Sequence, residues 1–432
     1  MEEEKPQKKQ SKDGQKNAFQ IFLEELIRGA PEHSSRLRRV WQVLSIPVLA
    51  ILTGLLVGGV IIILTTEEVF AAWAQSPLAS LAAAWDVVSN AYSALFTGSL
   101  GDPARIIAAL QSGDGLAIRR AFNPIFESLV SSIPYIFAGL SVALGFRAGL
   151  FNIGAEGQIF VGAICAAFAG YAITGVPAII HIPLAIMAGA IGGGLWGFIP
   201  GWLKAKTGGH EVINTIMMNF IAFRLSDWLL SGPMQRPDSF NPVSPTIQAT
   251  AVLPRLFDHP IRFHLGFFIA LFIAWLVYWF LFKTKYGFFL RTVGANPHAA
   301  RYAGMNVLTG VVLAMTMAGA LAGLAGANEV LGVNYHLAMA FSSGYGFDSI
   351  ALALIGKSHP LGVVLAALLF GTLRNGAVRM QLAAGIPIDI ISVLQGLILA
   401  FVAAPAIIRT IYRLRAPEAH EEEVTVSGWA GD

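Results

Sequence analysis

Residues 146–158, with the sequence FRAGLFNIGAEGQ, form a polar stretch that three glycines interrupt between two long apolar runs. Each of these runs is long enough to cross a bilayer. An irregular backbone at membrane depth persists only where it is buried in protein or lines a water-filled cavity. A second segment, residues 283–305 (KTKYGFFLRTVGANPHAARYAGM), is a basic loop between two further apolar runs. The two features indicate a protein that provides a pathway for a solute and takes its energy from a separate component. They fit a membrane anchor or an enzyme less well.

The composition is that of an all-α, polytopic integral membrane helix bundle. Of the 432 residues, 55% are hydrophobic and only 13% are charged, whereas a soluble domain carries about 25% charged residues. The net charge of +3 is too small to indicate a nucleic-acid partner. Cys165 is the only cysteine, which excludes a disulfide within the chain and a thiolate metal site. Its place in an apolar run is typical of a small core residue.

About ten membrane spans are predicted, because a helix needs about 20 apolar residues to cross the hydrocarbon core. The stretch 347–376 is ambiguous: it is either one long helix or two short helices that meet at Lys357 to Pro360. With two short helices, and with the N-terminus in the cytoplasm, most of the 29 Lys and Arg residues lie on the inner side, as the positive-inside rule requires. The other predicted spans are 40–64, 124–146, 158–180, 182–203, 212–231, 263–282, 307–331 and 386–408.

The two ends and two long segments lie outside these spans. Residues 1–39 are predicted to be a cytoplasmic extension, either with a short interfacial helix or partly disordered. Residues 416–432 form an acidic cytoplasmic tail, and residues 40–415 form the membrane domain. No cleavable signal peptide is evident. On the outer side, we expect interfacial helices in 65–123 and an irregular loop in 232–262. Both could receive a soluble donor protein or act as a lid.

A possible internal repeat relates the two halves of the chain. Residues 147–158 precede apolar runs and then HEVINTIMMNFIAF (210–223). Residues 341–356 (FSSGYGFDSIALALIG) likewise precede apolar runs and then IPIDIISVLQGLILAF (386–401). Many transporters contain such repeats and bind their substrate at the repeat interface. The residue similarity is weak, so it only supports the prediction.

Polar residues within the apolar runs are the candidates for a solute pathway. Charged groups at the bilayer centre cost about 2.5–3.5 kcal/mol each on insertion scales, so those that are retained usually face the bundle interior. Asn152, Glu156 and Gln158 cluster around the glycines of the first segment. They either line the pathway or its gate, or belong to a cytoplasmic turn in which Glu156 pairs with Arg147.

A polar stripe at helical spacing marks residues 211–219. Polar residues recur there at three- and four-residue spacing, which suits either helix packing through hydrogen bonds or pathway lining: Glu211, Asn214, Thr215 and Asn219. Further pathway candidates are Asn328, Glu329, Tyr345 and Asp348.

The basic loop contains the signals of a short helix. Asn296 can cap it, Pro297 suits its first position and Gly304 suits the C′ position after its end. Arg291, His298 and Arg301 are expected to form a basic, solvent-facing side. The alternative is a plain positive-inside loop.

Several catalytic and nucleotide-binding motifs are absent from the sequence. Gly356-Lys357-Ser358 resembles the end of a phosphate-binding loop, but Ala351 replaces its first glycine. We therefore expect no ATP binding by this chain. The sequence also has no HExxH, no GxSxG and no histidine pair at ligand spacing, so we predict no catalytic residues, metal or cofactor.

At these segments the chain resembles the permease subunit of bacterial ATP-binding-cassette importers, in the nucleoside and simple-sugar branch of the branched-chain amino acid/ribose-type family. The resemblance rests on residues 146–158, 210–222 and 291–305, and extends through GYGFDSIALALIG (344–356) and HPLGVVLAALLFGTLRNGA (359–377). It covers about residues 120–410. The sequence departs from the family at Gly209-His210, where a small residue and Asn are usual.

The resemblance implies a non-catalytic subunit of the bacterial inner membrane that translocates a nucleoside or simple sugar. It implies three protein partners: a cytoplasmic ATPase that binds residues 291–305, a second permease subunit, and an extracellular or periplasmic solute-binding protein. Membrane lipid would surround the bundle. The main alternative is an ion-coupled secondary transporter in which Glu211, Asp227 or Glu329 carries protons. An integral-membrane enzyme is a third possibility, although the chain lacks a convergent set of catalytic groups.

Overall fold

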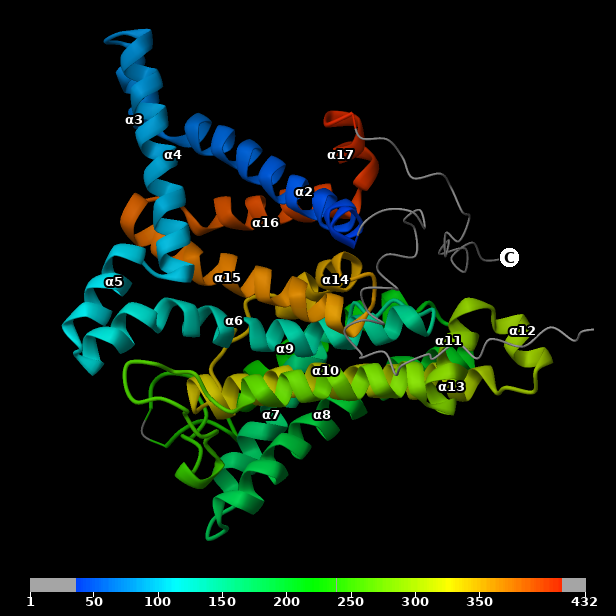
Figure 1. The fold of residues 1–432 in the computed structure, drawn as a ribbon. Helices are drawn as coiled ribbons and strands as arrows, with labels where there is room; N and C mark the ends of the chain where they lie inside the picture. The colour runs from blue at the N-terminus through cyan, green and yellow to red at the C-terminus, as the bar shows by residue number, and fades with distance from the viewer. Residues whose placement is uncertain (1–35, 238, 414–432) are drawn as a thin grey trace, which may run out of the picture.

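Long helices that run nearly side by side build the protein in the computed structural model, which describes residues 36–237 and 239–413 (Figure 1). Within these ranges the only β-structure consists of two isolated bridges, Val243 with Ala338 and Arg255 with His264. The helices are α2 (Arg36–Thr65), α3 (Glu67–Trp73), α4 (Pro77–Leu100), α5 (Pro103–Ser112), α6 (Gly115–Arg147), α7 (Ala155–Ala172), α8 (Ala178–Thr207), α9 (Glu211–Leu230), η1 (Ala249–Ala251), α10 (Gly266–Lys283), α11 (Lys285–Ala295), α12 (Pro297–Tyr302), α13 (Val307–Asn328), the π-helix η2 (Glu329–Asn334), α14 (Tyr345–Ile355), α15 (Pro360–Ala384), α16 (Ile388–Ala403) and α17 (Pro405–Ile411).

Among the described residues, seven helical segments are long and apolar enough to cross a membrane: Val48–Thr65, Gly115–Arg147, Ala155–Ala172, Ala178–Thr207, Gly266–Lys283, Val307–Asn334 and Pro360–Ala384. Three further helices occupy the remaining predicted spans. Helix α9 carries charged residues, and α14 and α16 are shorter, with 11 and 16 residues. The chain is therefore an all-α, polytopic membrane protein. The predicted interfacial helix before residue 36 and the acidic tail after residue 415 lie outside the described residues.

The predicted break near Lys357 is confirmed, because α14 ends at Ile355 and α15 begins at Pro360. Only the first of these two helices is short, however. Helix α15 has 25 residues and continues past the predicted end at 376. One of its polar residues, Asn375, is hydrogen-bonded to other helices: its side chain donates to the Gly98 and Pro124 carbonyls.

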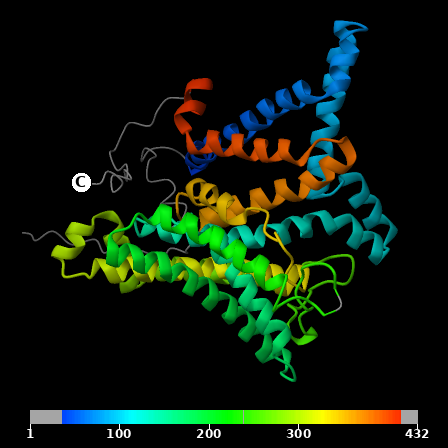
Figure 2. The ribbon, with the colours of Figure 1, turned by 180° about the vertical axis from the view of Figure 1, so that it is seen from behind.

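Helix α6 begins nine residues before the predicted start of its span, because Asp114 caps it by accepting from the Leu116 and Ala117 N–H groups. The segment that precedes α6 forms α3, α4 and α5. Figures 1 and 2 show α4 running across the end of the bundle and not along it. Ser80 in α4 donates to the Val69 carbonyl, which ties α4 to α3.

Glycines allow α7, α8 and α13 to approach one another backbone to backbone. A Cβ atom on Gly193 of α8 would overlap the backbone of Gly319 and Gly323 in α13, and one on Gly162 of α7 would also overlap Gly323. Small residues at such spacing bring membrane helices into close van der Waals contact. These three helices therefore pack in close backbone contact with one another.

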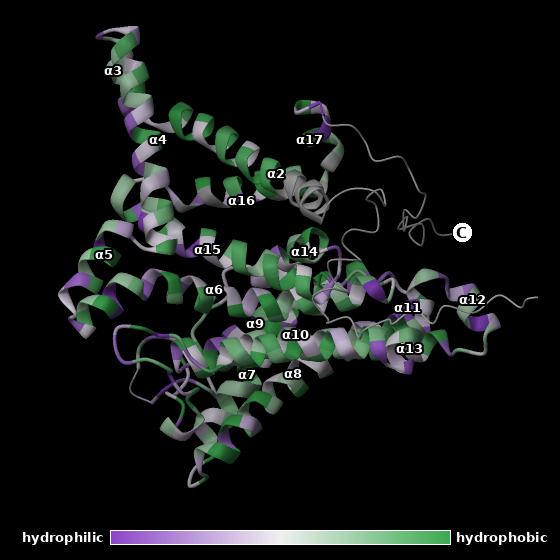
Figure 3. Cartoon of the chain, in the orientation of Figure 1, coloured by the Kyte–Doolittle hydropathy of each residue, from purple (hydrophilic) through white to green (hydrophobic). Residues whose placement is uncertain are grey.

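Hydrophobic residues predominate along the helices of the bundle, and hydrophilic residues gather towards its two ends (Figure 3). On α10, for example, Phe268, Phe272, Trp275 and Trp279 are each about half exposed, as expected for side chains that face lipid. Helix α12 lies at one end of the bundle, and α5 lies at the opposite end with the loop that follows α9 (Figures 1 and 2). The segments predicted to be cytoplasmic and external are thus separated by the length of the bundle.

Candidate functional site

The turn between α6 and α7, residues 148–154, is held by the amide side chains that the sequence singled out. Asn152 and Gln158 form a reciprocal pair: the Asn152 amide donates to Gln158 Oε1 at 2.9 Å, and the Gln158 amide donates to Asn152 Oδ1 at 3.1 Å. Asn152 Oδ1 also accepts from the Gly154 N–H. Both side chains are fully buried, so their hydrogen bonds are used within the protein.

Asn219, from the polar stripe of α9, completes this arrangement. Its Oδ1 accepts from the Gly157 N–H at 2.8 Å and its Nδ2 donates to the Ile153 carbonyl at 3.0 Å. Irregular backbone at membrane depth needs such partners. The structure thus brings Asn152, Gln158 and Asn219 together at the turn, where their amide groups bond to its backbone and to one another.

Glu156 connects the same turn to α14. Its carboxylate accepts from the Gly346 N–H in the first turn of α14 at 2.5 Å. The backbones touch as well, since a Cβ atom on Gly346 would lie 2.5 Å from Glu156 Cα. The two glycine-rich acidic segments of the possible repeat therefore meet directly. Arg147, the partner expected for Glu156, instead donates to the carbonyls of Ser358 and Lys357.

The other residues of the α9 stripe lie near the end of α8. Glu211 is buried and accepts from Lys204 Nζ at 2.5 Å, an ion pair between α9 and α8. Asn214 is half-buried beside Gly209. This part of the stripe is separate from the turn held by Asn219.

Asn328 and Glu329 lie where α13 passes into the π-helix η2. Both side chains are buried, with 4% and 6% of their surface exposed. The two amide atoms of Asn328 have no hydrogen-bond partner among the described residues. Buried amides normally bind protein or ordered water, so Asn328 keeps an unused hydrogen-bond donor and acceptor at this position.

Tyr345 and Asp348 belong to a cluster of polar and aromatic side chains between α6, α14 and α15. Tyr135 of α6 donates its hydroxyl hydrogen to Asp348 Oδ2 at 3.0 Å and accepts from Arg374 Nη1 at 3.2 Å. The rings of Tyr135 and Tyr345 meet edge to face, with their centroids 5.0 Å apart, and the Arg374 guanidinium lies 5.6 Å from the centre of the Tyr345 ring.

This cluster, called here the tyrosine–aspartate cluster, remains accessible. The Asp348 side chain is 35% exposed and that of Arg374 is 27% exposed. Sequence reasoning missed Tyr135 and Arg374. Arg374 offered a signal, because it is a charged residue in an apolar helix. Tyr135 offered none, since it lies in an ordinary apolar run.

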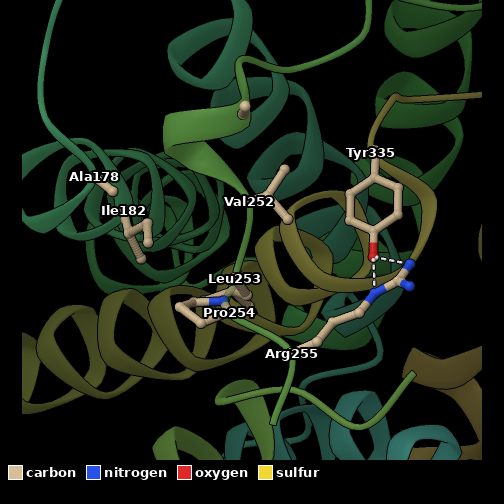
Figure 4. Close-up of a pocket in the computed structure, with 8 residues that line it drawn as sticks. Ala178, Ile182, Val252, Leu253, Pro254, Arg255 and Tyr335 are labelled. Atoms are coloured by element: carbon tan, nitrogen blue, oxygen red, sulfur yellow. Dashed lines mark hydrogen bonds between the residues drawn. The ribbon is translucent and has the colours of Figure 1, made fainter. Parts of the chain in front are cut away.

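A groove of about 490 Å³ lies elsewhere, between the start of α8 and the loop that contains η1 (Figure 4). In it, Arg255 donates from Nε and Nη2 to the Tyr335 hydroxyl oxygen at 3.2 and 2.9 Å. None of the predicted pathway residues lines it. Its other walls are aliphatic and include Ile182, Val252 and Leu253, so it presents few groups that could bind a polar solute.

The predicted loop helix is present as α12, Pro297–Tyr302. Asn296 caps it by accepting from the His298 and Ala299 N–H groups at 2.9 and 3.0 Å. At its end Gly304 has a φ of +78°, and the Met305 N–H donates to the Ala300 carbonyl, which is the bonding of a Schellman motif. His298 and Arg301 are exposed, as predicted.

Arg291 does not share this exposed side. It lies on α11, where its Nε donates to the Leu281 carbonyl at 3.0 Å and its guanidinium lies 5.1 Å from the centre of the Phe282 ring. The Phe282 ring and the Leu281 carbonyl, both at the end of α10, hold the Arg291 side chain against the protein. Tyr302, which was not predicted, is 98% exposed at the tip of α12.

A polytopic bundle with an accessible polar cluster among its helices, and with a capped basic helix at one end, has the organisation of the membrane component of a transporter. Residues 124–410 match the family model described as the branched-chain amino acid transport system / permease component.

Named relatives cover most of the chain. The guanosine ABC transporter permease protein NupP of Bacillus subtilis is 38% identical over 85% of this chain and 95% of its own length. The glucose ABC transporter permease protein TsgB13 of Haloferax volcanii is 32% identical over 84% of this chain and 87% of its own. The nucleoside ABC transporter permease protein NupB of Lactococcus lactis is 35% identical over 66% of this chain and 81% of its own length. No solved structure matches the chain.

The chain therefore belongs to this permease family and is the membrane-spanning permease subunit of an ATP-binding-cassette importer, not an enzyme. This assignment sets aside the ion-coupled secondary transporter.

Proposed function

We propose that this permease subunit carries a nucleoside across the bacterial inner membrane, with a simple sugar as the alternative solute. The observation that carries the proposal is the similarity to a guanosine permease over 85% of this chain and 95% of that protein. A second relative is named for nucleosides and a third for glucose. Nucleosides and sugars share hydroxyl groups on a ring, so one kind of site chemistry serves both.

The tyrosine–aspartate cluster has the groups that such a solute needs. The Asp348 carboxylate can accept hydrogen bonds from ribose hydroxyls, and Arg374 can donate to them. The Tyr135 and Tyr345 rings, 5.0 Å apart, offer aromatic surface to a base or to the apolar face of a sugar.

Accessibility favours this cluster over the turn residues as the lining of the pathway. Asp348 and Arg374 are both partly exposed, whereas Asn152, Gln158 and Asn219 are buried and each of their amide atoms has a partner within the protein. Charged side chains among membrane helices face the bundle interior or a water-filled cavity, because exposure to lipid is too costly. The exposed edge of the cluster thus suits a wet pathway. Asn328 and Glu329, at the far end of α13, would extend it.

The subunit would act with partners of the kinds that the permease family implies. A cytoplasmic ATPase would bind α12 through His298, Arg301 and Tyr302, whose side chains are exposed. A second permease subunit would complete the pathway, and a solute-binding protein would deliver the solute to the end of the bundle that carries α5. Both chain termini would then lie in the cytoplasm, in accord with the positive-inside rule.

The test is uptake by vesicles that contain this chain with its ATPase, its second permease subunit and its binding protein. We expect ATP-dependent uptake of labelled guanosine that unlabelled nucleosides suppress and glucose does not. The variant Asp348→Asn should lower uptake about tenfold or more, the usual effect of losing a hydrogen bond to a charged group. Asp86→Asn, at an exposed carboxylate of α4, is the matched control.

Suppression of uptake by glucose alone would favour the sugar. Unchanged affinity and rate in Asp348→Asn would show that the cluster is structural. Uphill accumulation by the permease in vesicles without its ATPase would contradict the proposed mechanism altogether.

A further inference from the structure

The α6–α7 turn lies against α11, the helix that precedes α12, without any side chain between them. A Cβ atom on Gly294 of α11 would lie 2.5 Å from the Arg147 carbonyl oxygen and 2.6 Å from Gly149 N. Conversely, a Cβ atom on Gly149 would lie 2.9 Å from Gly294 Cα. Interiors packed this closely transmit strain instead of absorbing it. A displacement of α11 therefore moves the turn.

Arg147, the last residue of α6, extends this contact to the turn between α14 and α15. Its Nε donates to the Ser358 carbonyl at 3.0 Å and its Nη2 to the Lys357 carbonyl at 3.3 Å. Lys357 and Ser358 have φ angles of +51° and +50°, a left-handed conformation that is unfavourable for two successive non-glycine residues. The planar fork of the guanidinium thus fixes two carbonyls of a strained turn.

The aromatic ring of Phe282, at the end of α10, joins the same elements. The Arg147 and Arg291 guanidinium groups lie 5.4 and 5.1 Å from its centre. His359, the residue directly before α15, lies 5.4 Å from it, ring centre to ring centre. Arg147 of α6, Arg291 of α11 and the start of α15 therefore share one packing site.

The other end of α14 is attached to the other side of the α6–α7 turn. Glu156, two residues after the turn, accepts from the Gly346 N–H. Helix α14 has 11 residues and carries Tyr345 and Asp348. Two residues that flank the α6–α7 turn thus hold the two ends of α14. Arg147 holds the end near Ser358, and Glu156 holds the end near Gly346.

We propose that Arg147 is a positioning residue that transmits the movement of α11 and α12 to α14, and through α14 to the tyrosine–aspartate cluster. The inference rests on the proposed function, because it takes α12 as the surface that the ATPase moves. Arg147 itself contacts neither solute nor nucleotide in this scheme. When α11 moves, its backbone contact at Gly294 displaces Arg147. Arg147 then displaces α14, the helix that carries Asp348.

The test compares Arg147→Gln and Arg147→Lys in the full complex with ATPase, second permease subunit and binding protein. The measured quantities are the stimulation of ATP hydrolysis by loaded binding protein, the solute taken up per ATP, and the affinity for the ATPase subunit. In both variants, the stimulation of ATP hydrolysis by loaded binding protein should fall about tenfold, which is within the usual range of coupling between sites. The ATPase subunit should still bind with normal affinity. Lysine should not restore coupling, because it lacks the fork. Lys206→Gln, an exposed basic residue in the last turn of α8, is the control.

A combined variant separates transmission from simple stabilisation of the strained turn. Adding Lys357→Gly and Ser358→Gly to Arg147→Gln removes the left-handed strain and should restore thermal stability, while coupling stays lost. Recovery of coupling in this variant would overturn the inference and leave Arg147 as a support of the turn. Normal coupling in both single variants would also overturn it. A complex whose unaltered form shows no ATP-driven uptake would instead refute the proposed function.

Discussion

Replacing Gly294 by alanine is the smallest change that separates α11 from the α6–α7 turn. The added Cβ would lie 2.5 Å from the Arg147 carbonyl oxygen and 2.6 Å from the Ala148 carbonyl carbon. Heavy atoms in good contact are about 3.5–4.0 Å apart, so α11 has to withdraw by about 1 Å. All of these neighbouring atoms are backbone, so no side chain can rotate to make room.

The energies show that this variant should still fold. Alanine is favoured over glycine inside a helix by about 1 kcal/mol, and overpacking a close contact costs about 1–3 kcal/mol. The net loss of stability is then about 0–2 kcal/mol, a modest fraction of the total stability of a folded domain. The displacement of α11, and not unfolding, should dominate the effect on function.

The assay measures two quantities on the assembled complex: thermal unfolding and the ATP hydrolysis that loaded binding protein stimulates. We expect near-normal unfolding with strongly reduced stimulation. The control is Gly396→Ala in α16, where an added Cβ meets nothing within 4 Å, and it should leave both quantities unchanged or slightly raise stability. Full stimulation in Gly294→Ala at normal stability would refute the idea that this contact carries the movement.

Three further predictions concern α12 and the outer loop. Asn296→Ala removes the cap of α12, which is worth about 1 kcal/mol, so the affinity for the ATPase subunit should fall about fivefold in a titration; an unchanged affinity would show that α12 is not the docking helix. Arg301→Glu reverses an exposed charge of α12 and should abolish ATP-driven uptake while the protein still reaches the membrane; retained uptake would contradict the docking role. Burial, and then the charges of Arg255 and Arg262, lower the pKa of His264 from 6.5 to about 4. The fold therefore favours the neutral ring: stability is complete above pH 6.5 and falls as the pH drops towards 4, by about 2 kcal/mol between pH 6.5 and 5. His264→Gln should flatten this part of a pH profile of thermal unfolding, and an equally steep profile would contradict the assignment.

The sequence predicts those parts of this structure whose causes are local. The long apolar runs became helices because a bilayer-length apolar segment satisfies its backbone only by forming one. Helix α12 was predictable in detail, since its N-cap Asn296, first residue Pro297 and terminal Gly304 all lie within nine positions of the chain. The break before Pro360 followed from the distribution of basic residues.

The polar contacts could not be predicted, because they join distant parts of the chain. Tyr135 and Asp348 are 213 positions apart, and Arg147 and Ser358 are 211 apart. The helical spacing of the α9 stripe showed that Asn219 faces a neighbour. Only the fold shows that this neighbour includes the irregular backbone at Ile153 and Gly157.

The shortness of α14 gives the strongest reason to treat it as one body with the α6–α7 turn. Its 11 residues span about 16 Å, roughly half of the hydrocarbon core, so a helix of this length cannot reach both surfaces of the membrane, and its buried end near Gly346 needs a partner from the protein. Glu156 satisfies an N–H at one end, and Arg147 satisfies two carbonyls just beyond the other. Breaking the buried bond between Glu156 and Gly346 would leave polar groups unpaired in a low-dielectric interior, at a cost of several kcal/mol. A transport cycle that keeps these bonds must move α14 and the turn together, and Asp348 with them.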